Sequence, residues 1–126
     1  MRDVYLVAAC RTPIGNFNGG LAPLRAHELG SIAIKEALNR AGIKPEQVDE
    51  VIFGNVLQAG EKQGPARQAS INAGIPVETP AYSINILCGS GLKSVILAAQ
   101  SIMLGESDII VAGGMESMTN APYSLD

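Results

Sequence analysis

Short apolar runs alternate along this chain with longer segments of helical periodicity. The runs predict strands, because each holds four to eight mostly apolar residues between polar or glycine-rich stretches. The first run, VYLVAA, is nearly continuous, which is typical of a strand buried on both faces of a sheet. The four predicted strands cover residues 4–9, 49–56, 81–87 and 108–112.

Three segments between these strands have apolar residues at the spacing of a helix face. The third segment is the clearest, with Leu92, Val95, Ile96 and Ala99 at positions i, i+3, i+4 and i+7. Glycine follows the first helix at Gly42, and proline suits the first turn of the second. The predicted helices cover residues 28–41, 65–73 and 91–104.

This strand and helix order, β-α-β-α-β-α-β, predicts an α/β fold with a mostly parallel sheet. One domain covering residues 1–126 is the expectation for this length. The last fourteen residues, GGMESMTNAPYSLD, have the composition of a loop and contain no further element. The pattern therefore indicates the first part of a domain rather than a finished one.

Composition and charge exclude several classes of protein. With 47% hydrophobic and 17% charged residues, the chain can form a core. The net charge is −3 and the basic residues are scattered, which argues against nucleic acid as a partner. No apolar run approaches the length of a membrane-spanning helix, and the N-terminus lacks the pattern of a signal peptide. The two cysteines, Cys10 and Cys88, form no metal-ligand or redox pair, and the simplest interpretation is a cytoplasmic protein with free thiols.

The stretch INILCGSGLKSV places Cys88 where a predicted strand ends and a helix begins. A dinucleotide-binding turn is one interpretation of its glycines. However, Ser94 stands where the third glycine would be needed, and this is the third strand rather than the first. A phosphate-binding loop is excluded, because Leu92 rather than glycine precedes Lys93.

An activated cysteine is the third interpretation. A thiol at a helix N-terminus faces unpaired backbone N–H groups and the positive end of the helix dipole, and both favour the nucleophilic thiolate. The same amides can hold an oxyanion formed at an attacked carbonyl. Free cysteine is also often a small buried residue without chemistry. The local pattern leaves nucleophile and packing residue both open for Cys88.

Four motifs resemble segments of the thiolases, the acetyl-CoA acetyltransferases, and they occur in the family's order. They span the chain and are ACRTPIG near the start, GNVLQAGEKQGPARQA at residues 54–69, NILCGSGLKSV, and AGGMESMTNAPY at residues 112–123. The resemblance implies a thiolase-like fold and a reaction through an acyl-cysteine on Cys88. It implies coenzyme A thioesters as substrates, above all acetyl-CoA, and no permanently bound cofactor or metal. The reaction would be formation of acetoacetyl-CoA from two acetyl-CoA, or its reversal by thiolysis.

The chain also departs from a complete thiolase. In the family, a histidine activates the nucleophile and a second cysteine acts as base, both from a C-terminal half. The one histidine here, His27, matches no such position and is expected to be a solvated residue near a helix start, while Cys10 is expected in the core. The family's loop domain, which makes most coenzyme A contacts, is absent. Solvated charges are expected at Lys62, Arg67 and Lys93, and the acyl pocket or packing role of Met115 and Met118 stays open.

The resemblance further implies a homodimer or homotetramer. In that fold the strand leading to the cysteine lies at a sheet edge and pairs with its copy in a second subunit. The uncharged stretch AYSINIL is compatible with this, because an exposed apolar edge invites aggregation. The alternatives are a catalytically incompetent dimerisation fragment and an enzyme whose missing half comes from a separate chain. A ketosynthase-like enzyme is disfavoured by CGSGL and GGMESM.

Overall fold

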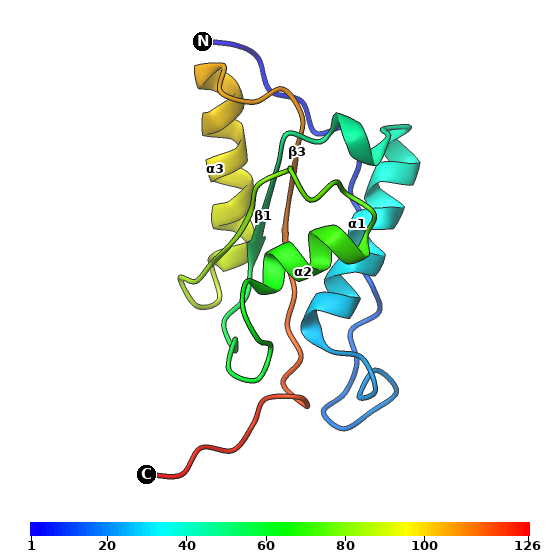
Figure 1. Cartoon of the computed structure of the whole chain (residues 1–126), viewed down its shortest axis with the longest axis vertical. Coiled ribbons are helices and arrows are strands. Elements are labelled where there is room, and N and C mark those ends of the chain that lie inside the picture. Colours follow the sequence, from blue (N-terminus) through cyan, green and yellow to red (C-terminus); the bar gives the residue numbers. More distant parts are fainter.

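The computed structural model describes all 126 residues as helices on both faces of a small parallel sheet. Strand order is β2-β1-β3, and both ladders are parallel. Helix α3 lies on one face of the sheet, whereas α1 and α2 lie on the other (Figure 1). In chain order the elements are α1 (Ala26–Ala41), η1 (Pro45–Gln47), β1 (Glu50–Gly54), α2 (Pro65–Asn72), β2 (Ala81–Ile84), α3 (Ser90–Leu104) and β3 (Ile110–Gly114).

The core lies between the sheet and the α1–α2 layer. Alternation along β1 sends Val51 and Phe53 into this layer, and Ile52 falls on the opposite face of the strand, toward α3. Ile34 of α1 and Ala69 of α2 are almost completely buried in the same cluster. The alanine-rich side of α2 allows the helix to pack closely on the sheet and on α1. This packing fixes β1 as the central strand.

The predicted strand at residues 4–9 does not form. These residues are extended without strand pairing, and Tyr5, Leu6 and Val7 are exposed. The only backbone–backbone hydrogen bond in the first ten residues runs from the Arg2 N–H to the Met103 carbonyl, at 3.4 Å. Apolar composition favours a strand. A strand also needs the edge of a neighbouring strand to pair with, and residues 4–9 pair with none. The observed order is therefore α-β-α-β-α-β.

The other predicted elements are confirmed, with small shifts at their ends. The largest shift is in β2, predicted to residue 87, which ends at Ile84. Leu87 has φ of 58°, in the left-handed region, and cannot continue a strand. The residues between β2 and α3 therefore form a tight turn.

Helix α3 is the most apolar of the three helices. The window Leu87–Leu104 spans 18 residues with a mean hydropathy of 1.4, long and apolar enough to cross a membrane by length and composition alone. The expectation that no apolar segment approaches the length of a membrane-spanning helix is therefore wrong for Leu87–Leu104. The helix itself has 15 residues, which rise about 22 Å against a hydrocarbon core of about 30 Å. One face packs on β1 and β3, and the other leaves Leu92, Ile96 and Leu104 exposed.

Candidate active site

Cys88 lies in the turn between β2 and α3, beside the C-terminal ends of β1 and β3. Its side chain is exposed and its thiol is free. It lines an open hollow of about 650 Å³. Residues that follow β1 and β3 form the other walls, namely Val56, Leu57, Met115, Glu116 and Met118. The carboxyl ends of three parallel strands thus converge on the thiol, the usual place for a ligand in an open α/β sheet.

Ser90 holds this turn in shape. The Ile86 N–H donates to the Ser90 hydroxyl at 2.9 Å, and that hydroxyl donates to the Leu87 carbonyl at 2.7 Å. The Leu87 N–H donates to the Asn85 side-chain oxygen at 2.9 Å. These bonds stabilise Leu87 in its left-handed conformation, which costs about 1–2 kcal/mol for a residue with a Cβ. Strained backbone beside a reactive group is a feature of functional sites.

Four backbone N–H groups around the thiol have no acceptor within the chain. They belong to Cys88, Gly89, Gly91 and Leu92, whereas the Ser90 N–H donates to the Leu87 carbonyl. Such N–H groups at the first turn of a helix carry partial positive charge. The turn therefore has donors available for an oxyanion.

Glycine lets α3 approach the strand ends closely. A methyl group at Gly54 would lie 2.7 Å from the Ser90 Cβ and 2.9 Å from the Gly91 nitrogen, both too close. On β3, a methyl group at Gly114 would lie 3.4 Å from the Gly91 Cα. The helix N-terminus consequently rests directly on the ends of β1 and β3.

The remaining residues singled out from the sequence lie elsewhere. His27 is not solvated as expected: its ring Nδ1 lies 2.7 Å from the Glu61 carboxylate, and the two side chains are only 14% and 4% exposed. Cys10, expected in the core, is half-buried. Its thiol donates to the Ala33 carbonyl at 3.1 Å, and it lines a second hollow of about 410 Å³, which shares Met115, Glu116 and Met118 with the first. Neither residue lines the Cys88 hollow, so neither activates the thiol.

The structure also places the basic side chains and the two methionines that the sequence analysis singled out. Lys62 is exposed, Arg67 donates to the Val77 carbonyl at 3.0 Å, and Lys93 is half-buried; none lines the hollow. Met115 is 7% exposed and packs against Gly30, which makes it mainly a core residue. Met118 is 62% exposed at the wall of the hollow. The chain contains no group of three or more side chains arranged to hold a metal ion.

Asn55 and Glu116, which the sequence analysis did not single out, complete the site. The Glu116 carboxylate accepts hydrogen bonds from the Val56 and Leu57 N–H groups and from the Asn55 side-chain amide, each at 3.0 Å. Their position after two predicted strands could have pointed to them, because parallel strands end at the same edge of the sheet, where ligands usually bind.

Comparison with known proteins gives consistent results. Residues 4–126 match the model of the thiolase N-terminal domain. The chain is 58% identical to an acetyl-CoA acetyltransferase of Cupriavidus necator, covering 99% of this chain and 32% of the relative. It is 60% identical to the cytosolic acetyl-CoA acetyltransferase ERG10 of Gibberella zeae, covering 97% and 31%. The solved Acat5 thiolase of Ascaris suum, in complex with coenzyme A, superposes with a TM-score of 0.97 at 43% identity, covering 99% and 33%. The chain thus spans about one third of the length of the relatives it matches.

Proposed function

The chain belongs to the thiolase family, and on this basis we propose that it carries the acyl-accepting part of an acetyl-CoA acetyltransferase, with Cys88 as the nucleophile. The observation that supports this role is the exposed thiol among four unpaired backbone N–H groups. Unpaired N–H groups occur at the start of any helix, and here they lie next to an exposed thiol in a turn that lines a hollow. The proposed substrates are coenzyme A thioesters, above all acetyl-CoA.

The first half-reaction exchanges one thioester for another. The Cys88 thiolate attacks the carbonyl carbon of acetyl-CoA, and the new C–S bond leaves a tetrahedral oxyanion that the free N–H groups can hold. The bond to the coenzyme A sulfur then breaks, and its thiolate leaves and takes up the proton lost by Cys88. Little free energy is needed, because one thiolate replaces another.

The second half-reaction needs a group that this chain does not place at the thiol. A base must remove a proton from the methyl group of a second acetyl-CoA, whose enolate attacks the acetyl carbon and releases Cys88 with formation of acetoacetyl-CoA. His27 is bound to Glu61, and Cys10 lies in the other hollow. We propose that the base, and the groups that bind coenzyme A, come from residues outside these 126.

Intact-mass measurement after incubation with acetyl-CoA tests the nucleophile. The chain should gain one acetyl group, lost in Cys88→Ala and retained in Cys10→Ser. The urea-unfolded chain serves as the control for simple chemical acetylation. Absence of acetylation above that control would instead support the alternative, a fragment that acts at most in dimerisation.

We propose that a second copy pairs along β2, the outer strand of the sheet. The strand carries no charged residue, and Tyr82 is 40% exposed on it. An open, uncharged edge is a site for strand addition. Sedimentation analysis should give a dimer for the native chain and a monomer for Tyr82→Lys; a native monomer at micromolar concentration would contradict the pairing.

We propose the cytoplasm as the compartment, as expected from the free thiols. Similar proteins include one named cytosolic in Mus musculus and one named mitochondrial in Danio rerio, so compartment varies among the relatives. Fractionation of cells that express the protein at its natural level should place it in the cytoplasmic fraction, and recovery in the mitochondrial fraction would contradict the proposal.

A further inference from the structure

Glu116 joins two loops that both line the Cys88 hollow. Its carboxylate belongs to the segment after β3, and its three donors belong to the segment after β1. One carboxylate oxygen accepts from the Leu57 N–H and the Asn55 amide, and the other accepts from the Val56 N–H. No other side chain makes as many hydrogen bonds between these two loops.

The surrounding contacts make this arrangement specific for a carboxylate. Asn55 is 1% exposed, and its side-chain NH₂ also donates to the Met115 carbonyl at 3.2 Å. All three partners of Glu116 are donors, so an uncharged amide in its place would direct its own NH₂ toward a donor. Hydrogen bonds to an ionised acceptor are also shorter and stronger than neutral ones.

We propose that Glu116 is a positioning residue that sets the width of the hollow around the Cys88 thiol. Val56 and Leu57 lie on the β1 side of the hollow, and Met115 and Met118 lie on the β3 side. The carboxylate holds the two sides at a fixed separation. Its importance for acyl transfer rests on the proposed function of Cys88.

The size selectivity of thiol alkylation tests this role. The chain carrying Cys10→Ser, with Cys88 as its only thiol, is treated separately with iodoacetamide and with bulkier N-benzyl iodoacetamide. Both reagents are neutral, so a changed charge at position 116 affects their rates equally and cancels from the ratio. In Glu116→Gln the bulky-to-small rate ratio should rise by about tenfold, because the β1 loop is no longer held against the β3 loop.

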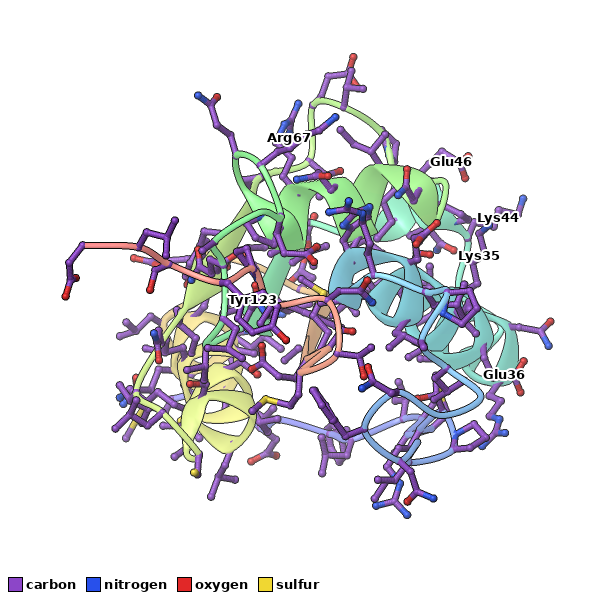
Figure 2. All side chains as sticks on the ribbon, turned by 90° about the horizontal axis from the view of Figure 1, so that it is seen from below. Lys35, Glu36, Lys44, Glu46, Arg67 and Tyr123 are labelled. Atoms are coloured by element: carbon purple, nitrogen blue, oxygen red, sulfur yellow. The ribbon has the colours of Figure 1, made fainter.

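Two further variants complete the experiment. Glu46→Gln is the matched control, because Glu46 is exposed on η1 and lies on the far side of the molecule from α3 (Figure 2); its ratio should equal that of the parent. Glu116→Asp keeps the charge but not the reach, and its ratio should lie between the two. If circular dichroism shows that Glu116→Gln is unfolded, the rate ratio of Glu116→Asp decides the test.

A parent-like ratio in a folded Glu116 variant overturns the proposal. Unfolding of both Glu116 variants would assign the residue to folding alone and would overturn it as well. The alkylation needs no acyl transfer, so failure of acetyl-CoA to acetylate Cys88 would remove the proposed function without changing this ratio.

Discussion

Gly54 at the end of β1 and Ser90 at the start of α3 approach each other so closely that a methyl group on Gly54 would lie 2.7 Å from the Ser90 Cβ. The two residues are 36 positions apart in the sequence, and their contact sets where the first turn of α3 meets the sheet. The thiol of Cys88 and the free N–H groups beside it depend on that placement.

Substitution of Gly54 by alanine should therefore displace the helix N-terminus. We expect a loss of about 1–3 kcal/mol in the free energy of unfolding from overpacking, together with slower acetylation of Cys88. Gly20→Ala is the control, because a methyl group there meets nothing within 4 Å. Urea unfolding and intact-mass time courses measure both effects, and equal behaviour of the two variants would contradict the close approach.

Removal of the Ser90 hydroxyl should loosen the turn before Cys88. Ser90→Ala leaves the Ile86 N–H without its acceptor and the Leu87 carbonyl without one donor. The expected loss in unfolding free energy is about 1–3 kcal/mol. Hydrogen exchange at Ile86 should accelerate more than exchange in β1, and uniform acceleration would mean that the hydroxyl stabilises the whole fold instead.

The left-handed conformation of Leu87 predicts an unusual stabilising change. Asparagine tolerates this region better than leucine, whereas a β-branched side chain tolerates it worse. Leu87 is 67% exposed, so little packing is lost on substitution. Leu87→Asn should raise the free energy of unfolding by about 0.5–1 kcal/mol and Leu87→Val should lower it, as thermal unfolding can measure. The opposite order would rule out backbone strain at this position.

The buried pair of His27 and Glu61 should be sensitive to removal of one partner. His27→Ala leaves a carboxylate that is 4% exposed without its ring partner. Leaving a buried polar group without its hydrogen-bond partner costs about 1–3 kcal/mol. The double variant His27→Ala with Glu61→Leu should recover part of that loss in urea unfolding, because no unpaired polar group stays buried. A double variant as unstable as the single one would show that the loss comes from packing.

Glu50 gives a pH dependence of stability. Burial, and secondarily the charge of Glu106, raise the pKa of the Glu50 carboxyl in the folded chain. The folded state thus holds this proton more tightly than the unfolded state, so the stabilisation is complete below the unfolded pKa and is lost as pH rises through the folded pKa. Glu50→Gln should therefore be slightly more stable than the native chain at neutral pH, by less than about 1 kcal/mol, and the difference should vanish in acid. Thermal unfolding at several pH values measures it; an equal difference at all pH values would exclude titration of Glu50 as the cause.

The sequence determined the elements whose cues are local. Helical periodicity and glycine stops placed α1, α2 and α3 within two residues of their observed starts. The seam between strand and helix made Cys88 a candidate nucleophile, and four motifs in order identified the family. These features depend on neighbouring residues only, so they can be recognised in a linear chain.

Tertiary structure alone decided the features that depend on distant partners. The run at residues 4–9 has the composition of a buried strand, yet pairing requires a neighbouring edge that composition cannot supply. His27 was expected in solvent, because its hydrogen-bond partner, Glu61, is 34 residues away and could not be recognised in the sequence. Glu116 and Asn55 are separated by 61 residues and meet only because parallel strands end at one edge of the sheet. The candidate nucleophile, Cys88, was therefore visible in the sequence, whereas the shape of the hollow around it was set by contacts that only folding brings together.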